Sequence, residues 1–251
     1  MDRPAFRRFV ARNRATVAVM FLAGLMTAPA WAADYSKSEK TALYQTSLKV
    51  PAAASAIPPL QAEILRRFQL QAKTVKDDAL DDKKAAPENF HPYMLDTQWR
   101  VTFESARIIS LSGLSFVDEN GAHPNDSFDT IVWDKTAKRA VKLPELFVKE
   151  KLPAALRGIA EYAKTALRKK FPREEGQPAD YDPVEGNIAA DPEKLGQYAL
   201  TYARGETRAN GIVLLWGAGE AWPHVMGDIR ISIPVSVFGS DLAPQWAAEF
   251  K

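Results

Sequence analysis

Residues Met94–Gly121, with the sequence MLDTQWRVTFESARIISLSGLSFVDENG, decide the fold class. Apolar and polar residues alternate along this segment in two runs, the second of which slips by one residue at Gly113. The apolar positions are Trp99, Val101 and Phe103, followed by Ile109, Leu111, Leu114 and Phe116. Strict alternation is typical of a β-strand with one buried face. The segment therefore predicts two antiparallel strands joined by a short turn.

The segments on either side of this pair extend the pattern to an α+β fold. Further strands are expected at residues 42–50, 127–134, 198–205, 211–219 and 228–238. A 3.6-residue apolar period predicts helices within residues 56–73 and 143–172. Residues 33–42 are polar and expected to fray, and the charged residues 76–89 are interpreted as a linker or helix tail. Strands, then a helix, then strands again predict an antiparallel sheet packed against one or two main helices.

The first 32 residues have the pattern of a cleaved secretory signal peptide. Five arginines precede the apolar run Val17–Met26, and Ala30 and Ala32 are the small residues of an A-x-A cleavage site. After cleavage we expect a periplasmic or secreted protein with no membrane span, because no other apolar stretch is long enough. Loss of those arginines leaves a slightly acidic chain, which argues against nucleic-acid binding.

Composition excludes several classes of site. The chain has no cysteine, so disulfides, thiolate metal sites and a cysteine nucleophile are excluded. We expect a small strand–helix region at residues 33–90 and an α+β domain at residues 91–251. No cofactor is expected, and the oligomeric state is not determined by the sequence.

Two glycine-containing loops are the candidate sites. They are GAHPN at residues 121–125 and GEAWPHVMG at residues 219–227. A strand follows the second loop, whereas a phosphate-binding loop opens into a helix, so nucleotide binding is disfavoured. The histidines of the two loops lie beside strands and could meet in space, but neither has the close spacing of a metal motif. The candidate binding residues are His123, Pro124, Glu220, Trp222, Pro223 and His224.

Several of these stretches together resemble a family of domains of unknown function. The matching residues are NGAHPN at 120–125, DTIVWDKTAKRAVKLPELF at 129–147 and GEAWPHVMGDIRISIP at 219–234. The family is identified as the C-terminal extracytoplasmic part of lysozyme-sensing RsiV anti-sigma factors, and it also occurs in PdaC-type peptidoglycan deacetylases. The resemblance implies an α+β fold, an envelope location and the small domain that often precedes this one. Gly219 and His224 stand where the family has tyrosines.

The sequence thus favours a non-enzymatic binding module of the cell envelope. The resemblance implies a lysozyme-like protein as its partner, and cell-wall glycan (peptidoglycan) is the other candidate ligand. One alternative is a metal-assisted hydrolase that uses His123 and His224. The other alternative is a structural envelope protein.

Overall fold

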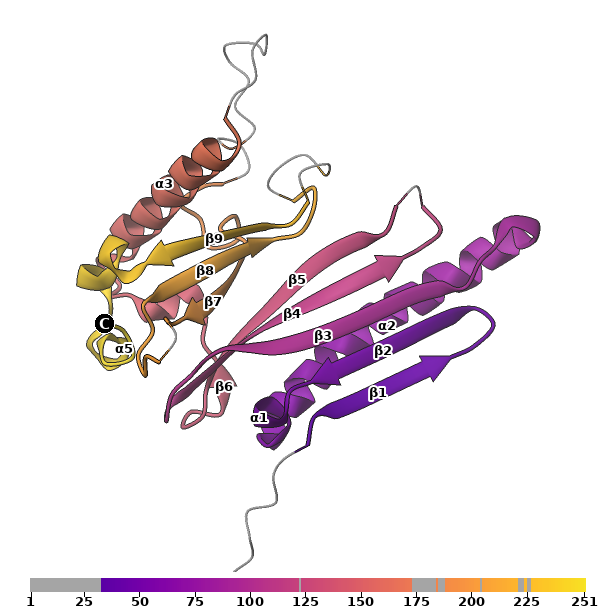
Figure 1. Ribbon diagram of the computed structural model, residues 1–251, viewed down its shortest axis with the longest axis horizontal. Helices are drawn as coiled ribbons and strands as arrows, with labels where there is room; N and C mark the ends of the chain where they lie inside the picture. Colours follow the sequence, from indigo (N-terminus) through magenta and orange to yellow (C-terminus); the bar gives the residue numbers. More distant parts are fainter. Residues whose placement is uncertain are drawn as a thin grey trace, which may run out of the picture. The chain divides into compact units, whose positions relative to one another are not determined.

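The central feature of the fold is a six-stranded sheet in the order β1-β2-β3-β4-β5-β6 (Figure 1). Its strands are Tyr35–Lys40, Tyr44–Val50, Tyr93–Glu104, Ile108–Asp118, Asn125–Asp134 and Arg139–Ala140. Strands β2 and β3 pair in parallel across the intervening helices, and all other neighbours are antiparallel. This computed structural model describes residues 33–121, 123–172, 184, 188–203, 205–220, 224 and 227–251. The expected signal peptide at residues 1–32 lies outside the described residues.

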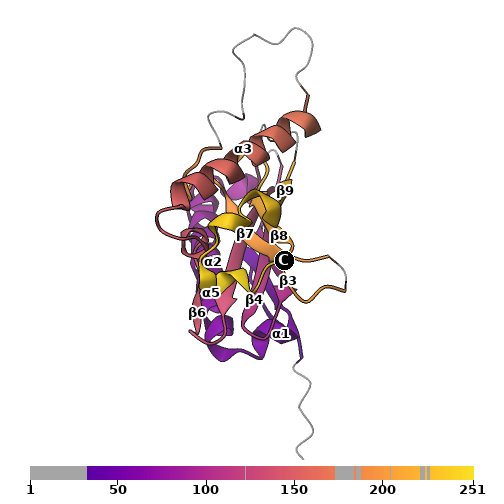
Figure 2. The same ribbon diagram turned by 90° about the vertical axis from the view of Figure 1, so that its left-hand side faces the viewer.

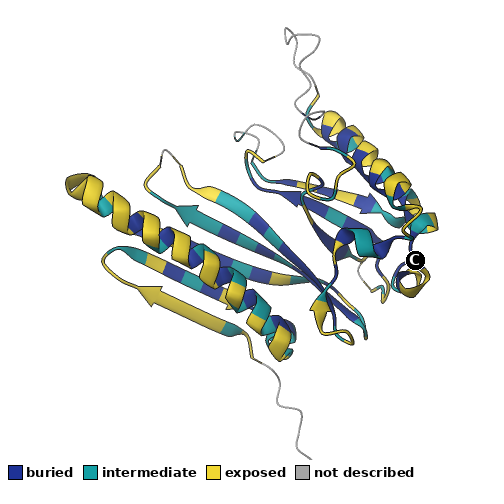
Figure 3. Ribbon diagram, turned by 180° about the vertical axis from the view of Figure 1, so that it is seen from behind, coloured by how far each residue is buried: buried dark blue, intermediate teal, exposed yellow. Residues whose placement is uncertain are grey.

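Helix α2 (Pro58–Ala85) covers one face of this sheet (Figure 3). It follows the short helix α1 (Ala52–Ser55) and precedes the 3₁₀ turn η1 (Pro87–Asn89). Its buried residues recur at three- and four-residue intervals, as one stripe against the sheet: Leu60, Ile64, Phe68, Ala72, Val75 and Ala79. Of the two interpretations of residues 76–89, the helix tail is correct as far as Ala85 and the linker is not, because Ala79 prolongs the buried stripe and the helix continues to Ala85.

A second sheet has three antiparallel strands, β7 (Gln197–Thr201), β8 (Gly211–Trp216) and β9 (Ile229–Pro234). Helix α3 (Leu152–Lys170) lies along the side of this sheet that faces away from the larger one (Figures 1 and 2). The other elements within the described residues are η2 (Leu143–Leu146), η4 (Val235–Val237), η5 (Gly239–Asp241) and α5 (Pro244–Ala247). Together they enclose a core in which Ile159, Leu214 and Phe238 are fully or nearly fully buried.

The two sheets are joined where β7 meets β4 and β5. The backbone N–H of Leu200 donates to the Ser110 hydroxyl at 2.9 Å, and the Thr130 hydroxyl donates to the Gln197 side-chain carbonyl at 3.2 Å. These bonds satisfy buried polar groups at the junction, as a packed interior requires. The predicted α+β fold with a mainly antiparallel sheet is confirmed. None of the described helices is long and apolar enough to cross a membrane.

Two local expectations are wrong. The polar residues expected to fray form the edge strand β1, which pairs with β2 from Tyr35 to Lys40. Exposed serine and lysine side chains suit an edge strand, whose backbone is held on one side only. The slip expected at Gly113 is absent, and the irregularity lies in β3 between Val101 and Phe103.

Candidate functional site

The two predicted loops meet in space beside the start of β5. The His123 ring, from the turn between β4 and β5, stacks on the His224 ring, from the connection between β8 and β9. Their centroids are 4.0 Å apart and their planes differ by 29°. A Cβ atom at Gly217 would lie 2.4 Å from the Asp126 carbonyl oxygen, so the connection runs directly against β5. Only glycine allows that approach.

The start of the β8–β9 connection is a tight turn held by its own residues. The backbone N–H of Gly217 donates to the Glu220 carboxylate at 2.8 Å, and the N–H of Glu220 donates back to the Gly217 carbonyl at 3.1 Å. Gly219 has a φ of +87°, which favours glycine there. The exposed carboxylate of Glu220 thus stabilises the turn, while Trp222 and Pro223 lie outside the described residues.

In the stacked pair of imidazole rings, His224 is more enclosed than His123. Nδ1 of His123 lies 3.4 Å from the carbonyl oxygen of the exposed Pro124. Among the described residues, Nε2 of His224 is buried without a hydrogen-bond partner, as is Oδ1 of Asp228 at the base of the connection. Burial, and next the Asp126 carboxylate, raise the pKa of Asp228. In the described part of the chain no three His, Asp or Glu side chains are grouped to hold a metal ion.

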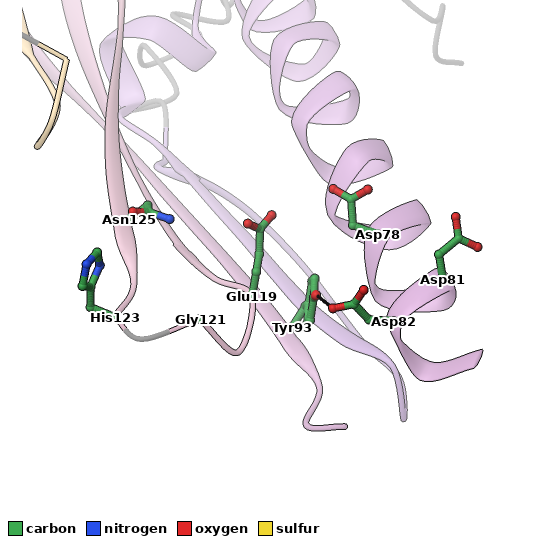
Figure 4. Close-up of a pocket in the computed structure, with 8 residues that line it drawn as sticks. All are labelled: Asp78, Asp81, Asp82, Tyr93, Glu119, Gly121, His123 and Asn125. Atoms are coloured by element: carbon green, nitrogen blue, oxygen red, sulfur yellow. Dashed lines mark hydrogen bonds between the residues drawn. The ribbon is translucent and has the colours of Figure 1, made fainter. Parts of the chain in front are cut away.

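An acidic cleft adjoins the His123 loop on the α2 side of the large sheet (Figure 4). We use the name acidic cleft for a cavity of about 360 Å³ lined by Asp78, Asp81, Asp82, Tyr93, Glu119, Gly121, His123 and Asn125. Figure 4 shows the Glu119 side chain directed toward α2, where Asp78 and Asp82 project. Three carboxylates from two elements therefore face a common space.

Not all carboxylates of the acidic cleft are neutralised. Asp81 pairs with Lys84 at 2.9 Å, and Asp82 accepts a hydrogen bond from the Tyr93 hydroxyl. Burial, and next that bond, raise the pKa of Tyr93. Across the described ranges, Asp78 and Glu119 form no ion pair. Burial, followed by the charges of Asp78 and Asp82, raises the pKa of Glu119. Such carboxylates are suited to bind ammonium or guanidinium groups through charge-assisted hydrogen bonds.

The raised pKa of Glu119 predicts that Glu119→Gln stabilises the protein at neutral pH. An acid whose pKa is higher in the folded state weakens folding once ionised, so stability falls as the pH rises through the folded pKa. Thermal unfolding at pH 7 should show a gain of up to about 0.5 kcal/mol, or about 1–2 °C, the size usual for interactions between partly exposed charges. The gain should vanish below the ordinary glutamate value of 4.5. The control is Glu150→Gln at an exposed position, which should change neither the free energy of unfolding nor the melting temperature. Equal stability of the two variants at pH 7 would contradict the prediction.

Comparison with known proteins shows that a solved structure shares this fold. No family model matches the sequence, and neither does any curated protein. A DUF3298-family protein from Bacteroides fragilis NCTC 9343 aligns in structure with a TM-score of 0.53 at 14% identity, over 88% of this chain and 98% of that chain. The chain shares the fold of that protein. A DUF3298-family protein from Pseudomonas aeruginosa PAO1 aligns with a TM-score of 0.48 at 13% identity, over 85% of this chain and 93% of that one.

Sequence reasoning found the two loops but missed the acidic side of the site. Asp78 and Asp82 lie in the segment interpreted as a solvated linker or helix tail. Extending the helical period one turn beyond Val75 to Ala79 would have kept this segment on the sheet. The aspartates would then have been expected beside the β4–β5 turn, four residues apart on one helix face.

Proposed function

We propose that this chain is an extracytoplasmic, non-enzymatic binding module whose acidic cleft and adjoining loops hold a basic protein, with a lysozyme-like protein as the leading candidate. The observation that carries the proposal is the pair Asp78 and Glu119, which face a concave space without a basic partner among the described residues. Lysine or arginine side chains of a partner would neutralise both. The arginine-rich, apolar N-terminal segment supports an extracytoplasmic location.

The acidic cleft can attract a basic partner even though the net charge of the whole chain is close to zero. A protein of nearly balanced charge offers little long-range attraction to a basic partner, since steering depends on the field at the binding surface. The acidic cleft concentrates negative charge at one place, next to loops that can add side-chain contacts. Complementary patches of this kind raise association rates and fix the orientation of the partner. The resemblance to the lysozyme-binding domain of RsiV proteins points to the same partner class.

A titration with native and lysine-acetylated hen lysozyme tests the proposal. Acetylation removes the ammonium charges and leaves the rest of the surface in place. Native lysozyme should bind, and its affinity should fall when ionic strength rises from about 0.05 M to about 0.5 M, as screening requires. Acetylated lysozyme should bind about tenfold more weakly or worse. The proposal fails if native lysozyme does not bind, or if acetylation and salt leave the affinity unchanged.

A further inference from the structure

A second groove lies on the side of the large sheet that α2 leaves uncovered. Figure 3 shows α2 in front of the sheet, and Figure 1 views the opposite side. The groove has a volume of about 290 Å³ and is bordered by β9 of the smaller sheet. We call it the arginine groove, lined by Asp96, Gln98, Arg100, Ser112, Leu114, Phe116, Phe128 and Arg230. It lies on the other face of the sheet from Tyr93, so it is separate from the acidic cleft.

Two arginines from different sheets border this groove. The guanidinium carbon of Arg230, on β9, lies 4.9 Å from the centroid of the Phe128 ring. Stacking of this kind holds the plane of the guanidinium and leaves its N–H edges free for a bidentate acceptor. Nη2 of Arg230 lies 4.0 Å from Oδ2 of Asp228, at the limit of an ion pair. Arg100, on β3, is exposed and has no ion-pair or hydrogen-bond partner in the described part of the chain.

Asp96, the one acidic side chain among the residues that line the groove, already accepts two hydrogen bonds. The Ser47 hydroxyl donates to Asp96 Oδ1 at 2.6 Å, and the Gln98 amide donates to Asp96 Oδ2 at 3.1 Å. These bonds satisfy Asp96 and orient Gln98 so that its carbonyl oxygen remains an acceptor. The two arginines outnumber this one carboxylate in the lining, so a net positive charge is left for a ligand.

The floor of the groove is apolar and narrow. Gln98, Leu114 and Phe128 lie in one row across β3, β4 and β5. Two inter-strand spacings make that row roughly 10 Å wide, which accommodates one sugar ring. The apolar face of a pyranose can stack on the partly exposed Phe116, and its hydroxyls can pair with Gln98 and Ser112. A volume of this size falls at the lower end of small-molecule sites.

We propose that the arginine groove binds a carboxylate-bearing saccharide, with the carboxylate paired to Arg100 and Arg230. Planar guanidinium groups match carboxylate geometry in a bidentate fork, which an ammonium does not. Two features of the groove together define the ligand class. The guanidinium groups favour a ligand with a carboxylate, and the row across β3, β4 and β5 favours a ligand with a flat apolar ring face. This site is independent of the proposed binding of a basic protein.

Isothermal titration with the N-acetylmuramic acid–N-acetylglucosamine disaccharide tests this inference. The full chain should bind the disaccharide, and Arg100→Gln/Arg230→Gln should weaken binding by about tenfold or more. Arg230→Lys keeps the charge but loses the fork, so it should weaken binding less than the double variant. Arg157→Gln/Lys149→Gln, at exposed positions elsewhere, has the same charge change and should leave the affinity within about twofold of wild type.

Two further ligands separate the alternatives. The uncharged N,N′-diacetylchitobiose, called chitobiose below, should bind about tenfold more weakly than the acidic disaccharide, because it lacks the carboxylate. An acidic peptide such as hexaglutamate should bind more weakly as well, because it has no ring for the apolar floor. The inference is overturned if the disaccharide does not bind, if the double variant binds it as well as wild type, or if chitobiose or hexaglutamate binds equally or more tightly. Unchanged thermal unfolding of the variants shows that they are folded.

Discussion

Gly217→Ala is expected to lower the free energy of unfolding by about 2 kcal/mol and to separate the two loops of the site. A Cβ atom at this position would lie 2.4 Å from the Asp126 carbonyl oxygen and 3.3 Å from Ser127 Cα. Both are backbone atoms of a strand paired along its length with β4. No side-chain rotation relieves such a contact, so the β8–β9 connection has to move away from β5. The stacking of His123 on His224 should be lost with it.

Thermal unfolding and NMR contacts between the two imidazole rings measure this effect. The melting temperature should fall by about 4–8 °C, and the contacts between the rings should disappear. The control is Gly158→Ala in α3, where the nearest atom to a new Cβ is 3.5 Å away. The same chemical change should there leave stability unchanged or raise it by up to about 1 kcal/mol, because alanine favours the helix. A Gly217→Ala protein that keeps both its melting temperature and the ring contacts would refute the account of the loop junction.

Gly113→Val is expected to cost about 3 kcal/mol or more, since it fills space held by the Trp99 indole. The nearest atom to a Cβ at 113 is Trp99 Cε2, at 2.7 Å. The indole is 5% exposed and belongs to the core between the sheet and α2. It has little freedom to move, because packed interiors hold few voids. The variant should therefore unfold at a clearly lower denaturant concentration than wild type.

A double-mutant cycle identifies the cause of that loss. In a Trp99→Leu background the ring is absent, so the added valine should cost at least about 1 kcal/mol less than it does in wild type. Urea unfolding of the wild type, both single variants and the double variant gives the coupling energy. If the two losses simply add, the valine is not destabilising the protein through Trp99.

The strands of the large sheet were predictable because their signal is local. Alternation alone located both strands, and the structure has β3 and β4 there, but it missed the irregularity between Val101 and Phe103 and wrongly added a slip at Gly113. The pairing of β1 with β2, and the parallel pairing of β2 with β3, had no such signal. Pairings of this kind depend on backbone groups and on helix packing between distant residues, and polar strands such as Tyr35–Lys40 carry no burial pattern.

The candidate site was predictable in part. Turn residues located both loops, and the sequence allowed the histidines to meet, as the stacked rings do. The acidic cleft was not predicted, since Asp78 and Glu119 are separated by an entire hairpin and approach only when α2 packs on the sheet. The close approach of Gly217 to the backbone of β5 was not predictable either, because a glycine next to a turn has several local explanations.

The most direct test of the central claim is the affinity of Asp78→Asn/Glu119→Gln for native lysozyme. Both substitutions keep the shape of the acidic cleft and remove two of the three lining carboxylates that form no ion pair in the described part of the chain. The matched control, Glu150→Gln/Glu193→Gln, removes the same charge from exposed positions elsewhere. The account predicts that affinity falls by about tenfold to a hundredfold in the cleft variant and stays within about twofold of wild type in the control. Equal affinities of the cleft variant, the control and wild type would contradict it.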